Sequence, residues 1–175
     1  MKNWIPIPGT KKEKIIGVAL EAFSKHGYKG VHIAELAKAA EVTTGAIYHH
    51  FGSKQNLYEV VKAEIEQRIL DRMEGAASLF EDPDRKLEAA FIVGLEFAIK
   101  NEVSVLMSEE INHNKVTKLE EFFASINDND IAGLDRLVLA LWRSVLKEIN
   151  EEQITPEQGK RLIKWVFKGK RPELS

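Results

Sequence analysis

The chain has 175 residues, of which 44% are hydrophobic and 30% are charged, and its formal net charge is −2. This composition is typical of a soluble globular protein, and the length suits one core or a small module on a larger body. The absence of cysteine excludes a disulfide framework and a thiolate metal site. The N-terminal sequence lacks the apolar core of a signal peptide, and no stretch has the roughly 18 apolar residues of a membrane span. We therefore expect a cytoplasmic protein that has no membrane partner.

Charge is distributed unevenly along the chain. Residues 1–56 contain eight lysines and four glutamates, a formal charge of +4, which leaves −6 for residues 57–175. Four of the five histidines also lie in the first part. Such asymmetry indicates nucleic-acid contact at the basic end, although a solvated lysine-rich surface explains it equally well.

Helix signals dominate the first third of the chain. Thr10 and Glu13 form a capping box, and apolar residues then recur with helical period until Gly27 ends the helix. A second, short helix is expected at about 33–40. After a brief break, the segment TTGAIYHHF at 43–51 forms a third helix, which ends at Gly52.

Longer helices are expected in the remainder. Ser53 caps a long helix that carries apolar residues to Met73, and Asp82 caps another over about 83–100. The apolar period continues through 131–149, and Thr155 caps a last helix through about Phe167; polar loops are expected at 112–115 and 127–130. No stretch alternates with a period of two long enough to form a sheet, so the sequence predicts an all-α fold.

The second and third helices carry the most specific signal. Two short helices joined by a short turn, the second with exposed polar groups, are typical of a helix-turn-helix, whose second helix enters the major groove of DNA. The 3.6-residue period places Ile47, His50 and Phe51 toward the domain. The same period places Thr44, Gly45, Tyr48 and His49 on the outer face.

The segment IAELAKAAEVTTGAIYHHFGSKQNLYEVV, at 33–61, resembles the DNA-binding signature of TetR-type bacterial transcriptional regulators. The resemblance implies a three-helix DNA-binding domain over 1–53 and a helical domain for effector binding and dimerisation over 54–175. It further implies a sequence-specific regulator: a homodimeric repressor that a small molecule releases from a pseudo-palindromic operator in double-stranded DNA.

The resemblance also implies roles for individual residues. The positions that match DNA contacts are His32, Thr43, Thr44, Gly45, Tyr48, His49 and Lys54. Within this set Tyr48 and Lys54 match phosphate contacts, whereas Thr44, Gly45 and His49 match positions facing base edges or the adjacent backbone. Thr43 is equally well explained as a helix cap. We expect His50 to be packed or hydrogen-bonded within the protein.

Two positions depart from the family pattern. His32 stands where Ser or Thr commonly caps the second helix, so we expect weaker capping there. Glu41 stands where the turn commonly holds glycine. If the backbone is left-handed at this position, Glu41 is strained and sets a negative charge near the DNA.

The second domain offers less specific signals. Aromatic and methionine side chains are candidates to line an effector pocket, although plain core packing explains each of them as well; the pocket candidates are Met73, Phe91, Leu95, Met107 and Phe122. The last two helices have more apolar surface than a lone hairpin buries, which favours a dimer interface. The interface candidates are Leu134, Leu137, Leu141, Trp142, Val145, Leu162, Trp165 and Val166.

Other chemistry is weakly supported. Glu109, Glu110 and His113 have an acidic-x-x-His spacing, but metal binding needs more convergent ligands, so we expect no metal site and no cofactor. The alternative functions are a helical-bundle enzyme and a protein-binding adaptor without DNA binding. The enzyme is disfavoured because the sequence has a single histidine after residue 50, no phosphate-binding glycine loop and no nucleophile elbow.

Overall fold

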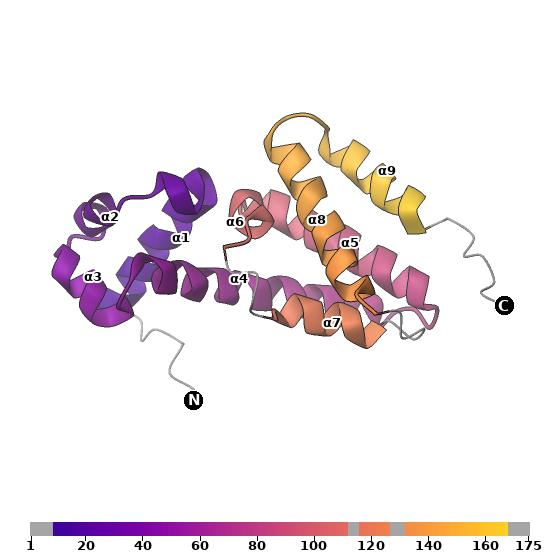
Figure 1. Cartoon of the computed structure of the whole chain (residues 1–175), viewed down its shortest axis with the longest axis horizontal. Helices are drawn as coiled ribbons and strands as arrows, with labels where there is room; N and C mark the ends of the chain where they lie inside the picture. Colours follow the sequence, from indigo (N-terminus) through magenta and orange to yellow (C-terminus); the bar gives the residue numbers. More distant parts are fainter. Residues whose placement is uncertain (1–8, 112–115, 127–131, 168–175) are drawn as a thin grey trace. The chain divides into compact units, whose positions relative to one another are not determined.

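The computed structural model describes residues 9–111, 116–126 and 132–167, and within these ranges every regular element is a helix (Figure 1). The predicted all-α fold is therefore confirmed. In chain order the helices are α1 (Lys11–Gly30), α2 (Ile33–Ala39), α3 (Thr44–Phe51), α4 (Lys54–Ala77), α5 (Pro83–Lys100), α6 (Ser104–Ser108), α7 (Lys118–Ile126), α8 (Leu134–Asn150) and α9 (Pro156–Phe167). The two predicted loops at 112–115 and 127–130 lie outside the described residues.

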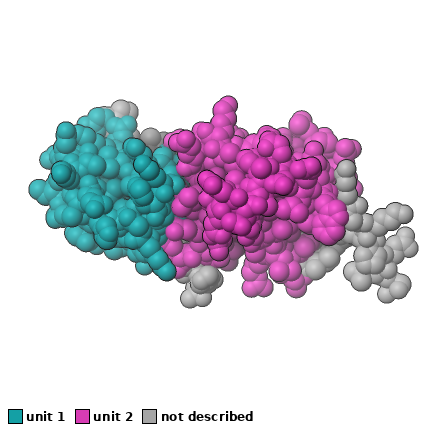
Figure 2. Space-filling model, turned by 90° about the horizontal axis from the view of Figure 1, so that it is seen from above, with its two compact units in different colours: residues 1–65 teal, residues 66–175 magenta. Residues whose placement is uncertain are grey.

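The chain divides into two compact units (Figure 2). The first comprises Met1–Ile65 and the second Glu66–Ser175, so the long helix α4 begins in one unit and ends in the other. The contacts thus group the first half of α4 with the helix-turn-helix. The functional boundary between residues 53 and 54 stays a prediction.

In the first unit, α1 starts where the sequence indicates, but it runs to Gly30 and is only interrupted at Gly27, where the sequence predicts its end. The Thr10 hydroxyl accepts a hydrogen bond from the Glu13 amide at 3.3 Å, and the Glu13 carboxylate accepts one from the Gly9 amide at 2.5 Å. Near its other end the helix breaks at Gly27, which has φ 65° and ψ −178°. Glycine takes this conformation at little cost because it has no Cβ. The break lets the last residues of α1 turn away from the helix axis.

A buried core holds the first unit together. It is formed by apolar side chains from all four helices, among them Ile15, Ala19, Phe23, Leu36, Ile47, Phe51, Leu57, Tyr58 and Val61. Three aromatic rings meet within or beside this core: Tyr58 packs edge-on against both Phe23 and Tyr28, with ring centroids 5.0 and 5.3 Å apart. The cluster fixes the start of α4 against the end of α1.

In the second unit, α8 packs against the short helices α6 and α7, and α9 packs against α5 (Figure 1). The bounds of α6 and α7 were not predicted from the sequence. The core consists of large apolar side chains, including Met73, Phe91, Leu95, Leu106, Phe123, Leu139, Trp142 and Leu146. The Asp82 carboxylate caps α5 by accepting from the Arg85 amide at 2.9 Å, and Thr155 caps α9 by accepting from the Gln158 amide at 3.2 Å.

Three helices end in the same way. Just beyond α2, α5 and α8, the backbone is left-handed at Glu41, Glu102 and Glu152, with φ of 53°, 56° and 55°. In each case the next amide bonds back to a carbonyl five residues earlier, for example Val42 to Ala37 at 2.9 Å. This is the Schellman motif, in which glycine is the usual residue at the left-handed position. A side chain there strains the backbone. The left-handed conformation considered for Glu41 is therefore confirmed, and the placement of its charge near DNA stays a prediction.

Candidate nucleic-acid interface

The α2–α3 turn orients the recognition helix. Ala40 closes α2, Glu41 takes the left-handed conformation, and the chain is extended at Thr43 before α3 begins. The Thr43 hydroxyl accepts a hydrogen bond from the Ala46 amide at 3.1 Å. Thr43 therefore caps α3, as one of its two expected roles requires, and its contact with DNA remains a prediction.

The two faces of α3 differ as the helical period predicts. Ile47 and Phe51 are 0% and 3% exposed and fix the helix to the core. Thr44, Gly45 and His49 are exposed, and so is Tyr48, at 50%. A large aromatic side chain that is half exposed beside two polar groups gives this face both hydrogen-bonding and stacking capacity. The dimensions of one helix with such a face suit the major groove.

His50 does not lie where the sequence analysis places it. It is exposed, and its ring contacts the rings of His49 and Phe51 with centroids 5.5 and 6.2 Å apart. The core is already filled by Ile47 and Phe51, so the His50 side chain turns outward. The expectation that it packs inside the protein was wrong.

His32 precedes α2 with an extended backbone, and its side chain makes no capping hydrogen bond. The expected loss of capping is therefore confirmed. The imidazole is exposed, so its nitrogen atoms are accessible to solvent or to a phosphate. That contact with DNA stays a prediction.

Lys54 is the first residue of α4, where helix amides and the helix dipole attract anions. The start of the helix is tied to α3: Ser53 accepts from the Asn56 amide at 3.0 Å, and the Asn56 side chain donates to the Phe51 carbonyl at 2.7 Å. The Lys54 ammonium lies 4.4 Å from the centroid of the Tyr28 ring. Sequence reasoning missed Tyr28, because its distance from Lys54 along the chain hides the contact.

Glu41 places a carboxylate at the turn, but a lysine compensates its charge. The Lys14 ammonium donates to the Glu41 carboxylate, and this hydrogen bond, together with the lysine charge, lowers the pKa of Glu41 below its usual 4.5. The ion pair also connects α1 with the α2–α3 turn. Lys14 was another residue that the sequence analysis did not single out.

The predicted pocket residues of the second unit lie in its core. Met73, Phe91, Leu95 and Met107 are buried, and Phe122 is half-buried on α7. The Met73 side chain packs onto Gly94 so closely that a Cβ on this glycine would lie 2.0 Å from the methionine methyl carbon. Four of the five candidates therefore belong to the core of the unit, and the role of all five in effector binding stays a prediction.

The predicted dimer residues separate into two groups. Leu137 and Trp165 are 70% and 76% exposed, and Leu162 and Val166 are exposed as well. Leu134 and Leu141 are half-buried. Trp142 and Val145, in contrast, are only 0% and 4% exposed within their own unit, so they have no surface to offer a partner. Their assignment to the interface was wrong, because they lie on the side of α8 that faces the core.

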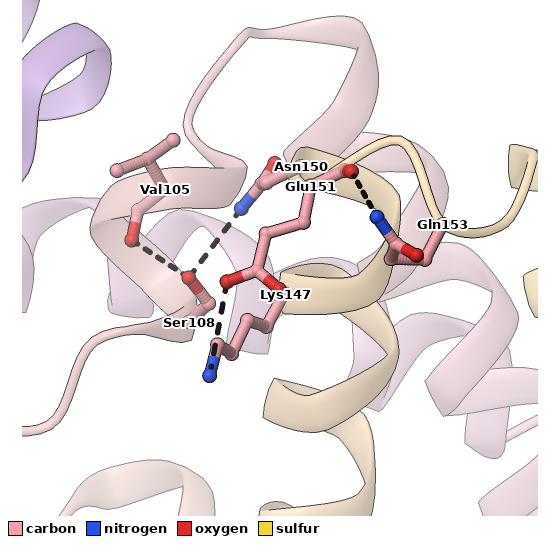
Figure 3. A network of polar contacts seen from close by, with 6 residues as sticks. All are labelled: Val105, Ser108, Lys147, Asn150, Glu151 and Gln153. Carbon is pink, nitrogen blue, oxygen red and sulfur yellow. Dashed lines mark hydrogen bonds and ion pairs between the residues drawn. The ribbon is translucent and has the colours of Figure 1, made fainter.

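Polar contacts hold α6 against α8 (Figure 3). The Asn150 amide group donates to the Ser108 hydroxyl at 3.4 Å, and this hydroxyl donates to the Val105 carbonyl at 2.9 Å. Arg143 of α8 adds an ion pair: its buried guanidinium lies 3.0 Å from the carboxylate of Glu110, two residues beyond α6. Among the described residues no group of three potential ligands could hold a metal ion. The third residue of the metal motif, His113, lies outside the described ranges.

Comparisons with known proteins agree with this geometry. Residues 15–61 match the family model of bacterial regulatory proteins of the tetR family. The chain is 36% identical over 103 residues to the transcriptional regulator AcrR of Shigella flexneri, covering 58% of this chain and 48% of the relative. It is 32% identical over 84 residues to the repressor AcnR of Corynebacterium glutamicum, covering 45% of each. The chain thus spans about half the length of the curated relatives it matches.

The fold extends the likeness over nearly the whole chain. A TetR-family regulator from Pectobacterium atrosepticum superposes with a TM-score of 0.69 at 20% identity, covering 95% of this chain and all of the other. Helices α2 and α3, joined by a short turn and with a polar exposed face on α3, form a helix-turn-helix. Residues 15–61 therefore match the tetR family of bacterial regulatory proteins, and the fold of the chain is similar to that of a TetR-family regulator. The family and the relatives named above are transcriptional regulators and not enzymes, and no helix of the described residues is long and apolar enough to cross a membrane.

Proposed function

We propose that the protein is a homodimeric transcriptional repressor that binds a pseudo-palindromic operator and is released from it by a small molecule. The observation that carries DNA binding is the exposed face of α3, where Thr44, Tyr48 and His49 project outward from a helix anchored by Ile47 and Phe51. A capped helix N-terminus and the Lys54 ammonium add two adjacent sites for phosphate.

Sequence-specific binding is tested by fluorescence anisotropy on the promoter beside the gene of this protein, with a shuffled duplex as competitor. We expect tighter binding to the promoter, and an affinity for both duplexes that falls as salt is added, because phosphate contacts release counterions. Lys54→Ala should weaken both complexes, whereas Lys100→Ala, at an exposed lysine of the second unit, is the matched control. Equal affinity for both duplexes, or affinity indifferent to salt, contradicts the proposal.

Homodimer formation is supported by the exposed apolar side chains of α8 and α9. We define the α8–α9 patch as Leu137, Leu162, Trp165 and Val166. An operator with two-fold symmetry needs two recognition helices about one DNA turn apart, which one chain does not provide. If the α8–α9 patch packs against the same patch of a second chain, its apolar side chains are buried and a second recognition helix is supplied.

Sedimentation of Trp165→Asp tests the patch, with Leu79→Asp as its control. The two parent side chains are almost equally exposed, at 76% and 77%, but Leu79 lies outside the patch. We expect the wild type and Leu79→Asp to sediment as dimers and Trp165→Asp as a monomer, because a carboxylate in an apolar interface has no partner. A dimeric Trp165→Asp would place the interface elsewhere.

Release by an effector is supported by the packing in the second unit. Met73 fills the space above Gly94, and methionine has a flexible side chain that adapts readily to a different neighbour. An apolar small molecule that displaces Met73 would occupy a site lined by Phe91, Leu95 and Met107. Native mass spectrometry of the purified protein tests for such a molecule. The expected result is a bound species whose addition weakens binding to the promoter; a species without this effect contradicts release.

A further inference from the structure

The position of the Lys54 side chain depends on a residue from another helix. Its ammonium lies over the face of the Tyr28 ring, 4.4 Å from the centroid. Tyr28 follows Gly27, whose left-handed φ of 65° breaks α1 and turns the chain. The two residues therefore meet although 26 positions separate them in the sequence.

The Tyr28 ring is itself held in place. Its edge-on contact with Tyr58 has a centroid distance of 5.3 Å, and Tyr58 makes a second such contact with Phe23 at 5.0 Å. Phe23 and Tyr58 are 0% and 1% exposed, so both rings are fixed by the core. Tyr28 is half-buried and joins this rigid group to the surface. The platform under Lys54 thus has little freedom to move.

A fixed aromatic ring changes how readily the Lys54 ammonium binds an anion. A free lysine side chain has many rotamers, and holding one of them in a complex costs conformational entropy. The negative face of an aromatic ring attracts an ammonium and leaves its outward N–H groups able to donate. Among the described residues no carboxylate forms an ion pair with Lys54, unlike Lys14, which pairs with Glu41. The charge of Lys54 is therefore held in position and left uncompensated.

We propose that Tyr28 is a positioning residue for DNA binding: its ring fixes the Lys54 ammonium beside the N-terminus of α4, where both bind one phosphate. This inference rests on the proposed function of the protein as a DNA-binding regulator. Tyr28 itself is not expected to reach the DNA through its ring, because Lys54 covers one ring face and the ring also packs against Tyr58 and stacks with Phe23.

The test replaces Tyr28 with phenylalanine and with increasingly fluorinated phenylalanines, in the full-length chain. Fluorine withdraws electrons from the ring face and removes its attraction for a cation while the ring keeps nearly the same size. Each protein is titrated with a random-sequence duplex of about 30 base pairs, long enough for two half-sites. The same series is made with Lys54→Met, and urea unfolding checks that all variants are folded.

In the Lys54 proteins, Tyr28→Phe should bind like the wild type, and affinity should then fall by about 2- to 5-fold per protomer at full fluorination. In the Lys54→Met series the affinity should not depend on fluorination, because the partner of the ring is absent. Equal affinity across the first series, or an equal fall in both, overturns the role of Tyr28 while DNA binding stands. If the wild type binds no duplex, the proposed function fails, and this inference fails with it.

Discussion

Two exposed surfaces of this protein contrast in chemistry. The outer face of α3 presents hydroxyl, imidazole and backbone groups, with Ile47 and Phe51 directly behind it in the core. The α8–α9 patch presents leucine, valine and tryptophan side chains, with Trp142 and Val145 behind it. Both surfaces lie on helices with a buried apolar face, but the α8–α9 patch adds exposed apolar side chains on the outer side of its helices.

The contrast shows how much chemistry a surface reveals about its partner. Hydrogen-bonding groups at fixed helical spacing have directions and charges, and these match the edges of base pairs and the phosphates beside them. Apolar side chains reveal only that something apolar covers them. The partner of α3 is therefore inferred from its own residues, whereas the partner of the α8–α9 patch is inferred from the two-fold symmetry of the proposed operator.

The largest expected effect is a loss of stability on replacing Trp142 of α8, and replacing Trp165 of α9 should have a different result. Trp142→Ala leaves a cavity in the core and should lower the free energy of unfolding by about 3–5 kcal/mol. Trp165→Ala removes an exposed side chain, so it should instead abolish the dependence of the melting temperature on protein concentration. Urea unfolding and thermal melts at two concentrations measure both. A large, concentration-independent loss in Trp165→Ala would show that this residue belongs to the monomer core.

On α3 we expect smaller effects on DNA affinity, and one of them should depend on the DNA sequence. His49→Ala should reduce discrimination between the promoter and a shuffled duplex by about 1–3 kcal/mol, the usual range for a side chain that reads a base edge. Tyr48→Phe should weaken both complexes to the same extent, because only a phosphate contact is lost. Competition anisotropy measures the two quantities together. If His49→Ala weakens both duplexes equally, His49 has no reading role.

At the α2–α3 turn, Glu41→Gly should stabilise the protein, because glycine relieves a backbone strain of about 1 kcal/mol. It should also strengthen binding to every DNA sequence, since the negative charge near the phosphates is removed. Glu152→Gly is the matched control: it relieves the same strain at the end of α8 and should leave DNA binding unchanged. If both variants gain affinity for DNA, the gain comes from the higher stability of the protein and not from the loss of a negative charge.

The smallest effect concerns the pH dependence of the Lys14–Glu41 pair. Because Lys14 lowers the pKa of folded Glu41 below 4.5, the pair stabilises the protein above that pH and loses its effect as the pH falls through the lowered pKa. Urea unfolding of the wild type and Glu41→Gln should therefore differ near neutral pH and converge in acid. A difference that persists or grows in acid would contradict the ion pair.

Sequence alone predicted what depends on local patterning. The helix caps at Thr10, Ser53, Asp82 and Thr155, and the faces of α3, follow from neighbouring residues and from the helical period. The orientation of His50 was missed, because the core has no space left after Ile47 and Phe51 are placed. The burial of Trp142 and Val145 was missed for a related reason. A broad apolar face on α8 does not reveal which part faces its own unit.

Contacts between distant residues were beyond such reasoning. The meeting of Tyr28 with Lys54 depends on the backbone angle of Gly27, and the ion pair of Lys14 with Glu41 depends on how α1 lies against the turn. The packing of Met73 on Gly94 likewise requires α4 and α5 to be placed. In each case the residue types are ordinary, and only the tertiary structure gives them a role.

The three glutamates that end α2, α5 and α8 have a consequence for the substitutions that this protein can tolerate. Each combines a left-handed backbone with a negative charge at the negative end of a helix dipole, and the three sites lie in different turns. Replacing them with glycine should give nearly additive gains in stability. Such a reserve would tolerate destabilising substitutions on α3, so a chain strengthened at these three turns is a suitable starting point for selecting a new operator preference.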